Sequence, residues 1–149
     1  MTTFREAQSR DAAAVLELYR QLHPDDPVLE DGRDLVVLEQ ILASDWLTLY
    51  LVEDAGRVLG TAYLNVIPNV TRGARPYAII ENVVTDEAVR GQGYGKALMA
   101  GVLEAAWAQG CYKVMLQTGS RRASTHAFYR ACGFSQDDKT GYVARPPGA

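Results

Sequence analysis

Residues 79–85 read IIENVVT and residues 86–99 read DEAVRGQGYGKALM. The first segment is rich in β-branched residues and is short enough for a strand. The second segment leads into a helix through three glycines spaced two residues apart, which let backbone N–H groups approach a ligand without interference from a Cβ atom. Free N–H groups at a helix start favour an anion, and Arg90 and Lys96 add positive charge there. The sequence therefore predicts a strand–loop–helix unit that binds a phosphate group.

The glycine spacing excludes two common nucleotide-binding patterns. A G-x-G-x-x-G pattern that starts at Gly91 would need its third glycine at position 96, where Lys96 stands. A G-x-x-x-x-G-K-[ST] pattern would need glycine in place of Arg90 and serine or threonine in place of Ala97. What remains is R-x-x-G-x-G over residues 90–95.

This pattern resembles the pyrophosphate-binding signature of the GNAT superfamily of N-acetyltransferases, which bind acyl-coenzyme A (acyl-CoA). Residues 127–134, AFYRACGF, resemble the FY-x-x-x-GF segment of the same family. The two matches occur in the expected order, and the resemblance covers nearly the whole chain. It implies an α/β (α+β) domain with a mixed sheet, the GNAT acyl-CoA N-acyltransferase fold, with six or seven strands and four helices in a single domain over residues 1–149.

The hydrophobic pattern along the chain fits this layout. Strands are expected at 3–7, 47–52, 58–67, 79–85 and 113–118, and a final strand or hairpin around Tyr142 and Val143. Helices are expected from an N-cap at Ser9 to about Leu22, and at 34–43, 94–109 and 124–131. Residues 54–57 are expected to form a hairpin turn, and residues 68–76 a polar loop.

Composition and charge exclude several classes of protein. The 149 residues suit one globular domain, and the net charge of −3 argues against nucleic-acid binding through overall charge. The first six residues have no apolar segment of a signal peptide, and no apolar run approaches membrane-spanning length. We therefore expect a cytoplasmic protein with no membrane and no nucleic acid as partner. Cys111 and Cys132 are expected to be free thiols, and no metal-ligand spacing is present.

The resemblance implies acetyl-coenzyme A (acetyl-CoA) as the acyl donor and assigns residues to it. Val83, Val84 and Thr85 are assigned to the pantetheine arm; the alternative is an ordinary buried strand. The pyrophosphate is assigned to the main chain of Arg90, Gly91, Gln92, Gly93, Tyr94, Gly95 and Lys96. Many relatives carry an asparagine where this chain has Arg122, which is expected either to contact cofactor phosphates or to belong to a solvated basic turn.

Two residues are candidates for acid–base chemistry. Acetyl transfer needs a neutral amine, yet a free alkyl amine has a pKa near ~10. Glu81 is the candidate base, since burial within an apolar strand would raise its pKa; the alternative is a solvent-facing or ion-paired carboxylate. Tyr129 matches the family tyrosine that protonates the departing thiolate, and its alternative is a core aromatic residue beside Phe128.

Acidic residues gather where this fold forms one wall of the acceptor site. They are Asp25, Asp26, Glu30, Asp31, Asp34 and Glu39. They favour a small cationic amine, although solvated loop residues are the alternative. The predicted function is a transferase, an N-acetyltransferase in which a primary amine attacks acetyl-CoA directly in a ternary complex. The alternatives are acetylation of a protein N-terminus or lysine, and a non-catalytic acyl-CoA sensor; a homodimer is a reasonable expectation for the family.

Overall fold

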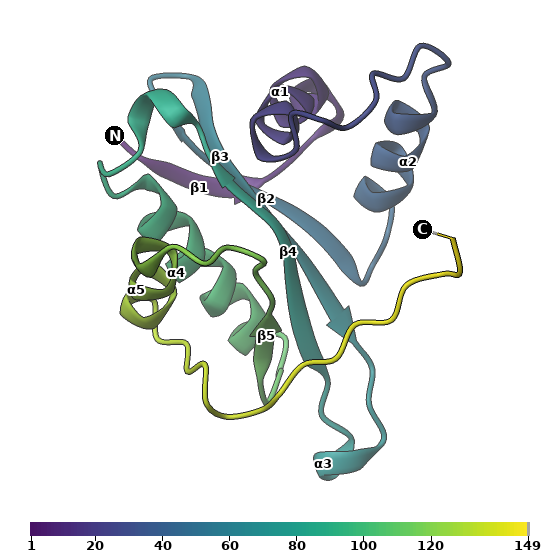
Figure 1. Cartoon of the computed structure of the whole chain (residues 1–149), viewed down its shortest axis with the longest axis vertical. Helices are drawn as coiled ribbons and strands as arrows, with labels where there is room; N and C mark the ends of the chain where they lie inside the picture. The colour runs from purple at the N-terminus through teal and green to yellow at the C-terminus, as the bar shows by residue number, and fades with distance from the viewer. Residues whose placement is uncertain (149) are drawn as a thin grey trace. The chain divides into compact units, whose positions relative to one another are not determined.

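Five β-strands form one mixed sheet in the order β1-β2-β3-β4-β5 (Figure 1). The strands span Thr3–Glu6, Leu47–Asp54, Arg57–Ile67, Tyr77–Thr85 and Val114–Leu116. Neighbouring strands are antiparallel from β1 to β4, whereas β4 and β5 are parallel. The computed structural model describes residues 1–148, which divide into two compact units, Met1–Leu116 and the residues from Gln117 onward. The whole sheet belongs to the first unit.

The β2–β3 hairpin turns where the sequence predicts it. Asp54 pairs with Arg57 in the ladder, so the turn has only two residues between the strands. Ala55 and Gly56 have φ angles of 50° and 76°, both in the left-handed region that two-residue hairpins require. The predicted turn at residues 54–57 is confirmed.

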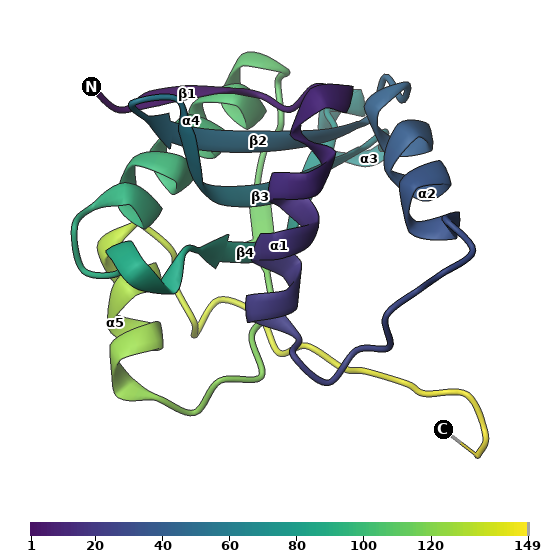
Figure 2. The same ribbon diagram turned by 90° about the horizontal axis from the view of Figure 1, so that it is seen from above.

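Helices cover both faces of the sheet (Figure 2). On one face lie α1 (Ala12–Leu22) and α2 (Arg33–Leu42). Val15 and Leu38 of these helices form one buried cluster with Leu49 and Leu51 of β2. Alternate residues of a strand face opposite sides, so this cluster defines the face of β2 that α1 and α2 cover.

The opposite face of the sheet is covered by α4 (Tyr94–Ala108). Its fully buried side chains are Leu98, Met99, Val102 and Ala106. The helix lies so close to β1 that a Cβ atom on Gly101 would come within 2.5 Å of the Phe4 ring. A glycine is therefore required at this crossing.

Three short elements complete the first unit: the 3₁₀ turns η1 (Ser9–Asp11) and η2 (Glu87–Val89), and the single turn α3 (Thr71–Ala74) within the predicted loop. The predicted N-cap at Ser9 is wrong, because the Ser9 hydroxyl donates to Glu39 (3.0 Å) instead. The carboxylate of Asp11 closes this turn by accepting from the Gln8 N–H (2.8 Å). The first helix therefore begins after Asp11.

The second unit contains α5 (Ala123–Ala131), which ends before Gly133 with its φ of 98°. The predicted final strand is wrong: Tyr142 and Val143 lie in no strand and are 92% and 66% exposed. Without a partner strand, two apolar residues gain nothing from an extended conformation. The sheet within residues 1–148 thus has five strands rather than six or seven, and α3 makes a fifth α-helix. The predicted single domain stays a prediction. No helix of residues 1–148 is long and apolar enough to cross a membrane.

Candidate functional site

The central strand β4 loses its neighbour halfway along its length. β5 pairs with β4 only from Ala78 to Ile80 and then ends at Leu116, whereas β4 continues to Thr85. Within residues 1–148, no strand pairs with this edge of β4 beyond Ile80. Unpaired backbone N–H and C=O groups are strong hydrogen-bonding sites. Residues 81–85 can therefore bind an extended ligand through their main chain.

A β-bulge lies at the same point of β4. Tyr63 pairs with Glu81 and Thr61 pairs with Val84, so one residue of β3 lies opposite both Asn82 and Val83. Asn82 has a φ of 52°, a left-handed conformation that asparagine tolerates better than most residues. A bulge bends the strand and redirects its backbone groups, and such bulges are frequent beside active sites. The predicted pantetheine residues begin directly at this bulge.

The loop after β4 is held in place from two directions. The Asp86 carboxylate accepts from the Ala88 N–H (3.0 Å) and pairs with Arg57 at the start of β3 (2.5 Å). The Gln21 side chain at the end of α1 accepts from the Glu87 N–H (2.9 Å). These hydrogen bonds, led by that of Ala88, hold the pKa of Asp86 below its usual value. The loop is therefore fixed before any ligand binds.

The predicted phosphate cradle is open and lined by main-chain donors. Gly91 and Gly93 have φ angles of 79° and 91°, and a Cβ atom built on either would meet nothing within 4 Å. Gly93 is the N-cap of α4, whose first intrahelical bond runs from the Ala97 N–H to the Gly93 carbonyl (3.0 Å). The N–H groups of the first turn thus have no helical partner, and no side chain of residues 1–148 caps them. This geometry fits a pyrophosphate group.

The side chains around the cradle divide into two groups. Arg90 and Lys96 are exposed, and Arg90 Nε donates to the Thr85 carbonyl (3.3 Å). Tyr94 instead donates its hydroxyl to Asp54 (3.0 Å), a contact that raises the pKa of Tyr94. Tyr94 therefore offers the cradle its backbone N–H rather than its side chain.

Glu81 differs from the prediction in its burial. Glu81 is exposed; it pairs with the half-buried Tyr63 of β3 and lies just before the bulge. The expectation that the Glu81 carboxylate is buried within an apolar strand is therefore wrong. Val84 is buried and Val83 and Thr85 are half-buried, so their side chains support the strand and only their main chain remains for a ligand.

Two tyrosines lie near the bulge: Tyr63, expected from the sequence either to line the cleft or to be a packing residue, and Tyr19, which was not predicted as a site residue. Burial raises the pKa of Tyr19 on α1 to about 12, and the nearby Asn82 amide opposes this shift. Burial also raises the pKa of Tyr63. Both tyrosines pack against the cluster under α1 and α2. The sequence feature that could have indicated the bulge is Asn82, because asparagine tolerates a left-handed backbone inside a strand.

Tyr129 and Arg122 belong to the second unit, whereas Glu81 and the cradle belong to the first. The Tyr129 ring packs against Phe128 (5.1 Å between centroids) and Phe134 (6.1 Å). Burial, together with the Cys132 thiol, raises the pKa of Tyr129. Arg122 is exposed at the start of α5, where its N–H donates to Ser120 Oγ (3.2 Å). Phe128, which the sequence assigned to the core, is only half-buried and packs against Tyr129.

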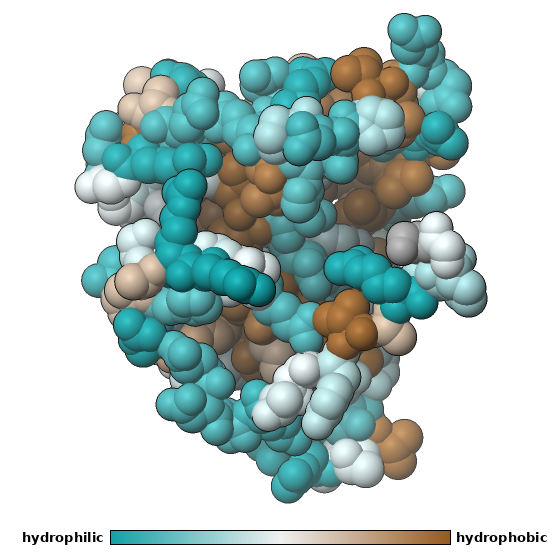
Figure 3. Space-filling view, in the orientation of Figure 1, coloured by the Kyte–Doolittle hydropathy of each residue, from teal (hydrophilic) through white to brown (hydrophobic). Residues whose placement is uncertain are grey.

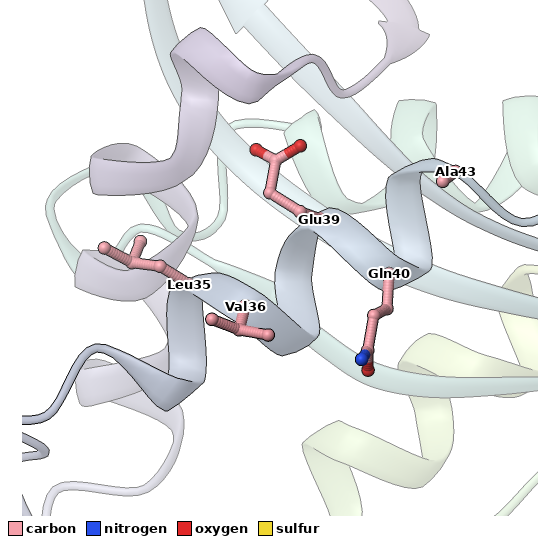
Figure 4. Close-up of a pocket in the computed structure, with 5 residues that line it drawn as sticks. All are labelled: Leu35, Val36, Glu39, Gln40 and Ala43. Carbon is pink, nitrogen blue, oxygen red and sulfur yellow. The ribbon is translucent and has the colours of Figure 1, made fainter.

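A shallow hollow of about 520 Å³ lies on α2, lined by Leu35, Val36, Glu39, Gln40 and Ala43 (Figure 4). Apolar side chains gather around this helix (Figure 3), and Val36 is 59% exposed. Both predicted free thiols, Cys111 and Cys132, lack a disulfide. No group of three metal-ligating side chains converges within residues 1–148.

A splayed central strand followed by a main-chain phosphate cradle is the arrangement that the resemblance to acyl-CoA-dependent transferases implies. Residues 12–134 match the acetyltransferase (GNAT) family. The chain belongs to this family and is an acetyltransferase.

Relatives with named activities fall into two groups. The chain is 31% identical to "Aminoglycoside N(6')-acetyltransferase type 1" of Stenotrophomonas maltophilia, over 97% of this chain and 93% of that protein. It is 38% identical to "Glucosamine 6-phosphate N-acetyltransferase" of Trypanosoma brucei brucei, over 58% of this chain and only 57% of that enzyme. A solved structure from Agrobacterium tumefaciens str. C58, assigned as an acetyltransferase, is 45% identical with a TM-score of 0.91, over 97% of this chain and 99% of that one.

Proposed function

We propose that this protein transfers an acetyl group from acetyl-CoA to the primary amine of an amino sugar or a similar small cationic molecule. The observation that carries the proposal is the continuity of the open β4 edge with the cradle, residues 83–96. A long donor needs both an anion site for its pyrophosphate and a strip of main-chain groups for its pantetheine arm. The first unit offers the two in direct succession.

The cradle would bind the donor largely through its backbone. The N–H groups of Tyr94, Gly95 and Lys96 point out of the first turn of α4, where the helix dipole favours negative charge. Arg90 and Lys96 add two exposed cations, and no acidic side chain lies in that turn. Val83 to Thr85 would hold the pantetheine arm along the unpaired edge, and Arg122 stays a candidate for a phosphate contact.

The chemistry then needs a base for the amine and an acid for the thiolate. Glu81 would accept the ammonium proton directly or through a water, since it is exposed beside the bulge and reachable by an incoming amine. The lone pair of the amine attacks the thioester carbonyl, the C–S bond breaks, and the nitrogen releases its second proton to solvent as the amide forms. Tyr129 would give its hydroxyl proton to the thiolate sulfur, and its raised pKa keeps it protonated at neutral pH. An ordinary thiol has a pKa near ~8.5, so this acid assists the step rather than making it possible.

The acceptor class is proposed from charge and from the relatives. Four acidic side chains of the α1–α2 connection and the first turn of α2 form no ion pair within residues 1–148: Asp25, Asp26, Glu30 and Asp34. The other two are engaged, Asp31 with Arg33 (3.4 Å) and Glu39 with Ser9 (3.0 Å). A cationic acceptor would be attracted to these four carboxylates, none of which is neutralised by an ion pair. The two groups of named relatives both act, by their names, on amines carried by sugars.

The test is a coupled binding and turnover measurement on the full chain. Calorimetric titration gives the affinity for acetyl-CoA, and thiol release is then followed with glucosamine, glucosamine 6-phosphate, an aminoglycoside, spermidine and a lysine-containing peptide. Turnover on an amino sugar supports the proposal. Turnover on the peptide alone would indicate that the acceptor is a protein rather than a small molecule. Tight binding of acetyl-CoA without turnover on any amine would favour the sensor, and an absence of binding would refute the donor site itself.

A further inference from the structure

A second cationic site lies at the other end of β4, on the tip of the β3–β4 hairpin. This tip includes α3 (Thr71–Ala74), which lies far from the start of α4 (Figure 1). Tyr77 and Thr85 are the two ends of β4, eight residues apart and thus roughly 26 Å at the usual rise of a strand. The hairpin tip is therefore separate from the phosphate cradle, and a ligand site at the tip is independent of the proposed function.

Three cations converge on two aromatic rings at this tip. The guanidinium carbons of Arg72 and Arg75 lie 6.0 and 5.6 Å from the centroid of the Tyr112 ring. The ammonium of Lys113 lies 5.4 Å from the same ring and 5.4 Å from the ring of Tyr77. The two rings themselves meet edge to face at 6.3 Å. Cations within about 6 Å of a ring centre are attracted by the ring, so the rings hold the cations in one place.

No carboxylate neutralises this cluster. None of the ion pairs within residues 1–148 includes Arg72, Arg75 or Lys113. Elsewhere in the same unit, Arg5 and Arg57 are each paired with an acidic side chain at 2.8 Å or less. Like charges that gather without a counter-charge repel one another, and the free energy of that repulsion falls when an anion binds. Arg72 and Arg75 are exposed, so an anion can reach them from solvent.

The backbone of the tip is fixed in an unfavourable conformation. Arg72 and Ala74 have φ angles of 58° and 57°, in the left-handed region that residues with a Cβ atom rarely adopt. Asn69 Nδ2 donates to the carbonyls of Thr71 (3.0 Å) and Arg75 (3.3 Å), which pins the turn. Arg75 Nε also donates to the Arg72 carbonyl (2.9 Å), which orients the guanidinium over the ring. Such conformational strain is typical of ligand clamps.

We propose that Arg72, Arg75 and Lys113 form an anion-binding site for a phosphate group. Two guanidinium groups can each offer parallel N–H donors to phosphate oxygens, while the ammonium adds a point charge. The rings of Tyr77 and Tyr112 form the floor that keeps the three cations together. The phosphate belongs either to a phosphorylated small molecule or to free inorganic phosphate, because both present the same oxygens.

The test is a titration of the full ¹⁵N-labelled chain with inorganic phosphate, followed by backbone amide shifts. Saturable shifts are expected at residues 72–77 and 112–113, and they are read separately from shifts of Gly91 and Gly93 in the cradle. The double variant Arg72→Gln/Arg75→Gln should weaken the hairpin site at least tenfold while the cradle shifts persist. Lys113→Gln should also lower the affinity of the hairpin site for phosphate. Sodium chloride at equal ionic strength should produce no saturable shift at the hairpin.

The matched control is Arg20→Gln, which removes an exposed arginine of α1 that is already paired with Glu17 (2.8 Å). This variant should bind phosphate at the hairpin as the parent chain does, and thermal unfolding of each variant verifies its fold. A second arm replaces inorganic phosphate by glycerol phosphate: tighter binding identifies a phosphorylated molecule as the ligand, and equal or weaker binding identifies free phosphate. Absence of saturable hairpin shifts in the parent, or an affinity in the double variant equal to that of Arg20→Gln, would overturn the proposal.

Discussion

Arg57 Nη2 lies 2.5 Å from Asp86 Oδ2, so the first residue of β3 is tied to the residue at which the loop of the predicted phosphate cradle begins. Asp86 is 8% exposed, and its second oxygen accepts from the Ala88 N–H (3.0 Å). One carboxylate thus caps the turn η2 and anchors the loop to the sheet. The shape of the cradle depends on this residue although Asp86 itself offers nothing to a phosphate.

Replacing this carboxylate should loosen the loop and remove a pH dependence. The Ala88 N–H, and then the Arg57 guanidinium, hold the pKa of Asp86 below its usual 3.8, so its stabilising effect is present above pH 4 and is lost as the pH falls through the lowered pKa. Asp86→Asn should cost about 1 kcal/mol at pH 7 and less below pH 3.5. Urea unfolding at both pH values measures this. Asp138→Asn, at an exposed position of the second unit, is the control; equal losses at both pH values would contradict the assignment.

The cradle can be tested with a side chain placed where the phosphate would lie. Gly93→Val projects its methyl groups into the open space at the start of α4, so acetyl-CoA affinity should fall at least a hundredfold by calorimetry. The substitution also strains a backbone with φ of 91°, which costs about 1–3 kcal/mol of stability. Gly110→Val is the matched control, because Gly110 has a φ of 82°, equally open space and a place at the other end of α4. Equal affinity losses in the two variants would refute the cradle.

Because α4 crosses closely over β1, a single added methyl group at the crossing should lower the stability of the protein strongly. A Cβ atom on Gly101 would lie 2.5 Å from the Phe4 ring, which itself stacks on Tyr50 (4.9 Å between centroids) and cannot move freely. Gly101→Ala should therefore destabilise the protein by about 1–3 kcal/mol, as overpacked cores do. Gly119→Ala, at an open position with no Cβ neighbour within 4 Å, should have little effect. A Gly101→Ala variant as stable as its parent in thermal unfolding would show that the helix can shift.

Local patterns in the sequence predicted most of the elements, because each carries its own signal. The two-residue turn after Asp54 and the helix that begins after Gly93 both depend on residues close together in the chain. The bulge at Asn82 and the tie from Arg57 to Asp86 depend instead on how β3 meets β4, which no local pattern records. A carboxylate between Ile80 and Asn82 looked buried by its neighbours, yet Glu81 is exposed.

The proposed acid role of Tyr129 can be tested apart from its ring packing by removing only the hydroxyl. Tyr129→Phe should lower turnover about ten- to a hundredfold with little change in acetyl-CoA affinity, because the ring still packs against Phe128 and Phe134. Since burial raises the pKa of Tyr129, the hydroxyl stays protonated and the parent rate should not fall between pH 7 and 9 on its account. Tyr142→Phe, at a residue that is 92% exposed, is the control. An unchanged rate for Tyr129→Phe would assign the tyrosine to packing alone.

A substitution of Glu81 tests whether this residue, next to the bulge of β4, is the catalytic base. Glu81→Gln keeps the size and hydrogen-bonding capacity of the side chain but cannot take the ammonium proton, so kcat/KM for the amine should fall about a hundredfold with acetyl-CoA affinity unchanged. Raising the pH should restore part of the rate, since free neutral amine then becomes available without help. Glu104→Gln, an exposed carboxylate on α4, should leave the rate as it is. A Glu81→Gln enzyme with the parent rate and pH profile would place the base elsewhere, and Tyr19 and Tyr63 beside the bulge would be the next residues to substitute.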